Sequence, residues 1–259
     1  MRYHIDTIPI WDAFKSGSEC PLCTIYKKIE ADFIDSALGG SVMEPDTRIE
    51  VNKAGFCNEH LSMLYGMQNR LGLALMAHSH LKEIIKELSE NSKKVIDQAE
   101  IDEKKNIAVR SAQAVSKSYP YLKETEKLSQ SAHNRQSDCF ICNRIENSMV
   151  RYLETICAMW EDDPEFRKLF AASKGFCLDH YSRLLDTARR KMFGKPQREF
   201  IKELIRIEEE NLDRIEKDLE WFTLKFDYRN RDKPWGESRD AVERTLLKLR
   251  GWTPPAEKK

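Results

Sequence analysis

One short sequence pattern occurs twice in this chain, and it constrains the fold more than any other feature. The stretch AGFCNEHLSMLY at 54–65 returns as KGFCLDHYSRLL at 174–185, and a C-x2-C pair precedes each of them. The offsets between the matching cysteines and histidines are 119, 119, 120 and 120 residues. A repeat this regular indicates an internal duplication, which has to be recognised before any single residue is interpreted.

The residue types in the repeat are those of a metal site. Two residues between ligands let one tight turn direct two side chains at the same ion, and three thiolates with one imidazole suit tetrahedral Zn²⁺. The pattern predicts two Cys₃His zinc sites per chain, with an iron–sulfur cluster as the alternative cofactor. The eight predicted ligands are Cys20, Cys23, Cys57, His60, Cys139, Cys142, Cys177 and His180.

We expect each site to close within its own copy of the repeat. Cys20 and Cys23 would then join Cys57 and His60, and the second copy would close in the same way. The gaps of 33 and 34 residues between the half-sites leave room for a helix and a return. Local closure also loses less chain entropy than closure between the copies, although this cost grows slowly with loop length.

The seventh cysteine lies outside the repeat. Cys157, in LETICAMW, has no counterpart in the first copy and falls on an apolar helical face. Free cysteines are among the most buried residue types. The sequence therefore predicts a buried free thiol at this position.

The spacing of apolar residues predicts an all-α fold made of two duplicated helical repeats, each with a Cys₃His site and with the long helices packed together. Strand-like alternation is not apparent. The main helices are expected at 20–38, 57–67, 71–98, 139–160, 177–191, 198–226 and 240–249.

Pro120 interrupts a helical pattern, so we place the domain boundary there. This gives a first metal-binding repeat at 1–119 and a second at 120–230. The remaining segment, 231–259, has no partner in the first copy and is expected to dock its final helix across the repeats. The aromatic residues expected to hold it are Tyr228, Trp235 and Trp252.

The composition excludes several classes of protein. The 43 basic and 43 acidic residues balance, which gives no electrostatic case for binding nucleic acid or an anionic membrane. The longest strongly apolar run, at 71–77, is too short to span a bilayer, and the first residues do not resemble a signal peptide. We expect a cytoplasmic protein, where clustered cysteines more often bind metal than form disulfides.

The paired C-x2-C…G-F-C-x2-H units, the KFDYR…PWGE stretch and the final helix ending in LRGW resemble a family of uncharacterised bacterial proteins found in Firmicutes and their relatives. The resemblance covers nearly the whole chain. It supports metal binding at the eight ligands named above, and it implies no established activity. Transporter-like names within that family find no support in this sequence.

Two functions remain open at this point. The first is a zinc-binding helical protein with two structural sites that binds a protein partner or a small ligand. The second is a redox enzyme or electron carrier that uses iron–sulfur or another metal at the Cys₃His sites. No phosphate-binding loop, HExxH or G-x-S-x-G motif is present, and no catalytic residue is assigned.

Overall fold

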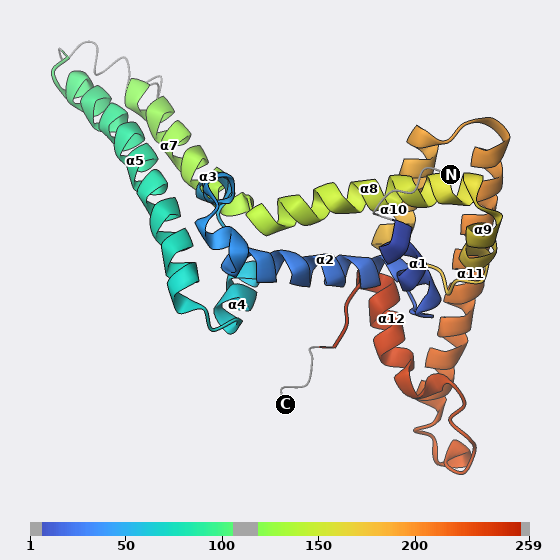
Figure 1. Ribbon diagram of the computed structural model, residues 1–259. Helices are drawn as coiled ribbons and strands as arrows, with labels where there is room; N and C mark the ends of the chain where they lie inside the picture. The colour runs from blue at the N-terminus through green and yellow to red at the C-terminus, as the bar shows by residue number, and fades with distance from the viewer. Residues whose placement is uncertain (1–6, 106–118, 255–259) are drawn as a thin grey trace. The chain divides into compact units, whose positions relative to one another are not determined.

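The computed structural model describes residues 7–105 and 119–254, which form α-helices and short 3₁₀ turns without any strand (Figure 1). This confirms the all-α fold. The elements in chain order are α1 (Thr7–Lys15), α2 (Pro21–Leu38), η1 (Gly40–Met43), α3 (Pro45–Ala54), α4 (Asn58–Gly66), α5 (Arg70–Glu103), α7 (Pro120–Ser137), α8 (Phe140–Asp162), α9 (Pro164–Ala171), α10 (Leu178–Lys191), α11 (Gly194–Leu224), η2 (Tyr228–Asn230), η3 (Ser238–Asp240) and α12 (Ala241–Arg250).

The chain divides into two compact units. Unit 1 consists of Met1–Ile29 together with Asn147–Lys259, and unit 2 is Glu30–Glu146. The division falls inside α2 and α8, so it does not coincide with the linear repeats expected at 1–119 and 120–230. Each unit therefore combines sequence from both copies of the repeat.

A cluster of phenylalanines forms the core of unit 1. The ring of Phe14 from α1 lies 5.1 Å from that of Phe166 on α9, in an edge-to-face arrangement. Phe170 lies 5.3 Å from Phe200 on α11 and 5.7 Å from Phe176, and the rings of Phe166, Phe170, Phe176 and Phe200 are fully buried. These contacts hold the Gly-Phe-Cys loop of the second copy against the core. Each aromatic pair contributes about 1 kcal/mol of stability beyond the contribution from burying its apolar surface.

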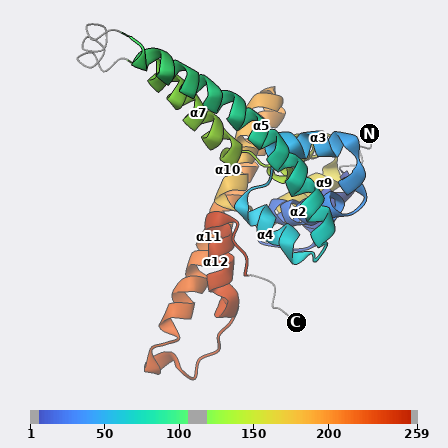
Figure 2. The ribbon, with the colours of Figure 1, turned by 90° about the vertical axis from the view of Figure 1, so that its left-hand side faces the viewer.

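In unit 2 the long helix α5 packs against α7 and α3. Figures 1 and 2 show the shorter helix α7 lying side by side with one part of α5. The sequence placed a boundary at Pro120 but did not predict α7, which begins at that proline. Pro at the first helical position is favourable because its missing N–H has no partner there anyway.

The C-terminal segment packs within unit 1, where α12 lies along α11 and also contacts α10 (Figure 2). Trp235 packs against Phe222 at 5.8 Å, as expected for a docking residue. The expectation for Tyr228 was wrong, because its side chain is 85% exposed. Within the part of the chain that the structure describes, no helix combines the length and the apolar character needed to cross a membrane.

Candidate metal centres

The structure gathers all eight predicted ligands into two groups. The unit 1 centre is Cys20, Cys23, Cys177 and His180, and the unit 2 centre is Cys57, His60, Cys139 and Cys142. Each residue offers one ligand atom, and within each group these atoms lie within 4.8 Å of one another. Both groups can hold a metal ion.

The expected pairing of half-sites was wrong. Each centre takes its C-x2-C from one copy of the repeat and its C-x2-H from the other. The physical reason is helix length. At 1.5 Å per residue the 18 residues of α2 are about 27 Å long, whereas the 10 residues of α3 could return at most about 15 Å toward Cys20. The mismatch is larger in the second copy, where α8 has 23 residues and α9 has 8.

All four half-sites have the same local geometry. The first cysteine of each directly precedes the first residue of a helix, and the second ligand is the third residue of that helix. The helices concerned are α2 and α10 in the unit 1 centre and α4 and α8 in the unit 2 centre. Two helix N-termini therefore face each group of thiols, and their unpaired N–H groups stabilise the thiolate form that binds metal.

The unit 1 centre is closed to solvent. Cys177 Sγ lies 3.1 Å from His180 Nδ1 and 3.6 Å from Cys23 Sγ. His180 Nδ1 is also 3.5 Å from Cys20 Sγ and 3.4 Å from Cys23 Sγ. The exposed fractions of the four side chains are 7% or less.

The last turn of α12 covers this centre. Gly251 follows the helix in the left-handed conformation, and a Cβ atom on it would lie 3.5 Å from Cys23 Sγ and 3.8 Å from Cys177 Sγ. The backbone of Gly251 thus packs directly over two thiols. The sequence showed the LRGW ending but gave no sign that its glycine lies against the ligands.

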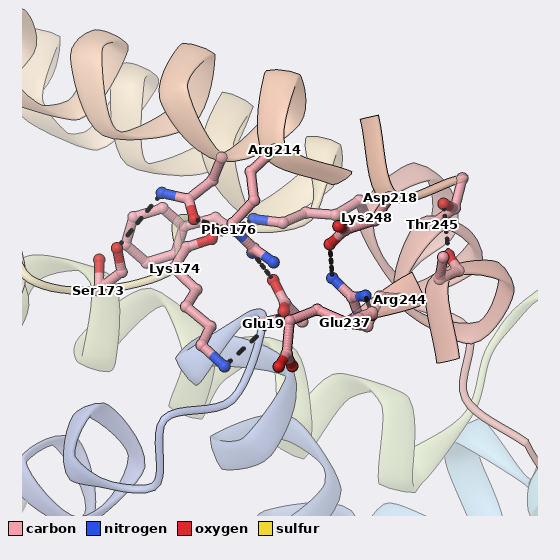
Figure 3. Close-up of polar contacts among 12 residues, drawn as sticks. Glu19, Ser173, Lys174, Phe176, Arg214, Asp218, Glu237, Arg244, Thr245 and Lys248 are labelled. Carbon is pink, nitrogen blue, oxygen red and sulfur yellow. Dashed lines mark hydrogen bonds and ion pairs between the residues drawn. The ribbon is translucent and has the colours of Figure 1, made fainter. Parts of the chain in front are cut away.

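Two buried ionisable side chains hold the loop that carries Cys177. The Phe176 N–H donates to Glu208 Oε2 over 2.8 Å, and Lys248 Nζ donates to the Lys174 carbonyl over 2.5 Å. Glu208 and Lys248 are 2% and 1% exposed, and Figure 3 shows Lys248 beside the loop. Between them lies Gly175, with φ of +76°, where a Cβ atom would be only 2.7 Å from Glu208 Oε2.

Burial raises the pKa of Glu208, although Lys248 and the Phe176 N–H oppose this effect. Burial also lowers the pKa of Lys248, against the attraction of Glu208 and Glu19. Nearby, Glu19, which directly precedes Cys20 in the chain, accepts from Arg214 over 2.5 Å, as Figure 3 shows for the Glu19–Arg214 contact. The sequence did not identify Glu208 or Lys248 as supporting residues, because both occur in ordinary-looking charged helices.

The unit 2 centre is more open. Cys57 Sγ lies 3.1 Å from His60 Nδ1 and 3.9 Å from Cys142 Sγ, and His60 Nδ1 is 3.4 Å from both Cys139 Sγ and Cys142 Sγ. His60 and Cys139 are buried, whereas Cys57 and Cys142 are partly exposed.

Different residues support the loop of the unit 2 centre. The Gly55 carbonyl accepts from the Phe140 N–H over 2.9 Å, which joins the two half-sites through the backbone. Arg135 donates to the Lys53 carbonyl over 2.6 Å. His80 packs so closely that a Cβ on Gly55 would lie 2.6 Å from its Nε2. His80 therefore packs against the Gly55 loop, and it is not among the four grouped residues of this centre.

Contacts between thiols and imidazoles shift pKa values in both centres. The hydrogen bond with Cys139, followed by the contact with the Glu30 carboxylate, raises the pKa of His60 to about 10. Burial raises the pKa of Cys139, but the bond to His60 and the backbone bonds outweigh it and lower the value to about 6. Metal binding requires thiolate and neutral imidazole, so an ion entering this group displaces the histidine proton.

The unit 1 centre behaves in the same way. Burial lowers the pKa of His180, but hydrogen bonds with Cys177 and Cys20 outweigh it and raise the value to about 9. Hydrogen bonds from Cys20 and Cys23 lower the pKa of Cys177. The bond with Cys177 correspondingly raises that of Cys23.

Cys157 belongs to neither centre. It is a free thiol, 2% exposed, and burial raises its pKa to about 12. The prediction of a buried free thiol is confirmed.

Comparison with known proteins places the chain in a family. Residues 1–256 match the model of the Family of unknown function (DUF6062), and the chain belongs to that family. Neither the curated proteins nor the solved structures contain a match.

Proposed function

Since the family has no assigned function, we propose from the geometry that this chain is a zinc protein with one structural Zn²⁺ in each Cys₃His centre. The observation that carries the proposal is the set of four converging protein ligands in each group. Structural zinc sites have four protein ligands, whereas catalytic sites keep a position for water or substrate.

The spacing of the ligand atoms supports a single ion in each centre. Zn–S bonds of about 2.3 Å in a tetrahedron separate two sulfurs by about 3.8 Å. One Sγ–Sγ distance from each centre is close to this value: 3.6 Å between Cys23 and Cys177, and 3.9 Å between Cys57 and Cys142. An iron–sulfur cluster places several iron and sulfide atoms among its ligands and needs a wider arrangement.

We extend the proposal to a binding role, with a protein or a small ligand as the partner. Structural zinc sites hold a surface in shape without turning over a substrate. The chain would work in a reducing compartment such as the cytoplasm, since all seven cysteines are free thiols and disulfides are rare there.

Elemental analysis tests the metal assignment. The full chain is purified without added metal and with oxygen excluded, and we expect two equivalents of zinc and no colour. Replacement by Co²⁺ should give the visible absorption of tetrahedral cobalt with thiolate ligands. Fewer than two ions would contradict the proposal, and a brown protein containing iron and sulfide would establish the redox alternative.

A further inference from the structure

The two centres share a ligand set but differ in access to solvent. In the unit 1 centre every ligand is buried, and Gly251 lies over Cys23 and Cys177. In the unit 2 centre Cys57 and Cys142 are partly exposed. The described residues of unit 2 contain no second copy of α12 and its glycine. A reagent in solution therefore meets thiols at only one of the two centres.

The two accessible thiols are neighbours. Their Sγ atoms are 3.9 Å apart, although the residues are separated by 85 positions in the chain. Cys57 directly precedes α4 and Cys142 is the third residue of α8, so the first turns of two helices bring the two thiols together. Of the cysteines in a protein, those that solvent reaches and that have a second cysteine beside them are well placed to be oxidised to a disulfide.

We propose that Cys57 and Cys142 are a modification site, at which a hydroperoxide forms a disulfide and displaces the unit 2 ion. One thiolate attacks the peroxide, the O–O bond breaks, and a sulfenic acid and hydroxide (or alkoxide) form. The second thiolate then attacks the sulfenic sulfur, forming the S–S bond and releasing a second hydroxide. The two sulfurs lose two electrons, the peroxide gains them, and two protons from solvent complete the products.

The loss of the ion follows from the loss of ligands. A disulfide sulfur is a poor ligand compared with a thiolate, so only Cys139 and His60 would remain to bind zinc. The release of the ion rests on the proposed function. The selective formation of the disulfide rests only on the exposure and proximity of the two thiols.

The test uses the full chain, reduced and loaded with zinc. Metal content is measured first, hydrogen peroxide is then added, and a chromogenic chelator records zinc release while trapped peptides are mapped by mass spectrometry. We expect half of the bound zinc to leave, a disulfide between Cys57 and Cys142, and reduced Cys20, Cys23 and Cys177. Thiol reductant and added zinc should restore the second equivalent.

Other outcomes would overturn the proposal. These are equal loss of zinc from both centres, a first disulfide that forms among the unit 1 cysteines, or the absence of a disulfide in unit 2 after peroxide treatment. If the first measurement finds no metal, the proposed function fails, and the disulfide map still decides the present proposal.

A truncated chain ending at Arg250 provides the matched control, because it removes Gly251 from the unit 1 thiols. Circular dichroism first checks that the truncated chain keeps its helicity. Cys23 and Cys177 should then oxidise at a rate close to that of the unit 2 pair. An unchanged rate would show that the cover does not cause the difference. Both chains carry Cys157→Ala, so that every thiol that is oxidised belongs to one of the two centres.

Discussion

Glu30 Oε1 lies 3.3 Å from His60 Nε2, on the opposite side of the imidazole from Nδ1, which faces the thiols. A carboxylate in this position holds the ring so that Nδ1 is the ligand, and it increases the basicity of that nitrogen. Since Glu30 is only 12% exposed in its side chain, the contact is shielded from competing water. Glu30 is thus a positioning residue for the unit 2 centre.

Replacing Glu30 tests that role. We expect Glu30→Ala to weaken zinc binding at the unit 2 centre by about 10–100-fold, as is usual for such partners of a metal-ligating histidine. Chelator competition measures the affinities of both centres. The matched control is Glu50→Gln, which removes the exposed carboxylate that pairs with Arg144, and it should leave both affinities unchanged. Equal weakening of the two centres by Glu30→Ala would indicate a general loss of structure.

Metal counts on double variants test the crossed pairing. Cys23→Ser combined with His180→Ala removes two ligands of the same centre, so the chain should keep one zinc ion. Cys23→Ser combined with His60→Ala damages both centres, so the chain should lose both ions. The opposite pattern would establish local pairing within each repeat.

Gly175 should not tolerate a side chain. Gly175→Ala places a Cβ atom 2.7 Å from Glu208 Oε2 and 2.9 Å from Lys248 Nζ, in a residue with φ of +76°. We expect the free energy of unfolding to fall by about 1–3 kcal/mol. Urea unfolding of the zinc-loaded chain measures this. Gly40→Ala, with no atom within 4 Å of the new Cβ and without a positive φ, is the control and should be close to neutral.

The buried carboxylate of Glu208 should make stability depend on pH. Its pKa is raised in the folded chain, so above the ordinary value of 4.5 the folded state binds more protons than the unfolded state. The free energy of unfolding should therefore fall as pH rises from about 4.5 through the folded-state pKa.

Glu208→Gln keeps an oxygen that can accept from Phe176 and removes the charge. In this variant the free energy of unfolding should fall less steeply with rising pH than in the wild type. Urea unfolding at a series of pH values measures this. Glu209→Gln, at the exposed neighbouring position, should retain the wild-type profile. If the free energy of unfolding depends on pH in the same way for wild type and Glu208→Gln, the pKa of Glu208 does not differ between the folded and the unfolded chain.

The sequence predicted individual helices well. The helix expected at 177–191 is Leu178–Lys191, and the one expected at 20–38 is Pro21–Leu38. Both have regular apolar spacing, and each follows directly after a ligand cysteine. The sequence also pointed to all eight residues that gather in the two groups, because their spacing is short and repeated. Local patterns carry this information within one or two helical turns.

What the sequence did not predict depends on contacts between distant segments. The lengths of α2 and α3 favour crossed over local pairing. Chain entropy could not decide between the two, because the entropic cost of closing a loop changes only slowly with its length. The roles of Glu208, Lys248 and Gly251 come from single contacts with the Cys177 loop and its thiols. A single polar contact has no periodicity, so nothing in the helical pattern distinguishes these residues from their neighbours.

The crossed pairing also sets the order in which the centres can form during synthesis. The unit 2 centre has all its ligands once Cys142 has been made, whereas Cys20 must wait for His180, which is 160 residues later in the chain. At about 5–20 residues per second, this delay lasts roughly 8–30 seconds. The first two thiols to leave the ribosome are therefore the last to be enclosed. The nascent chain passes through a stage in which the centre that ends up fully buried is still an open pair of cysteines.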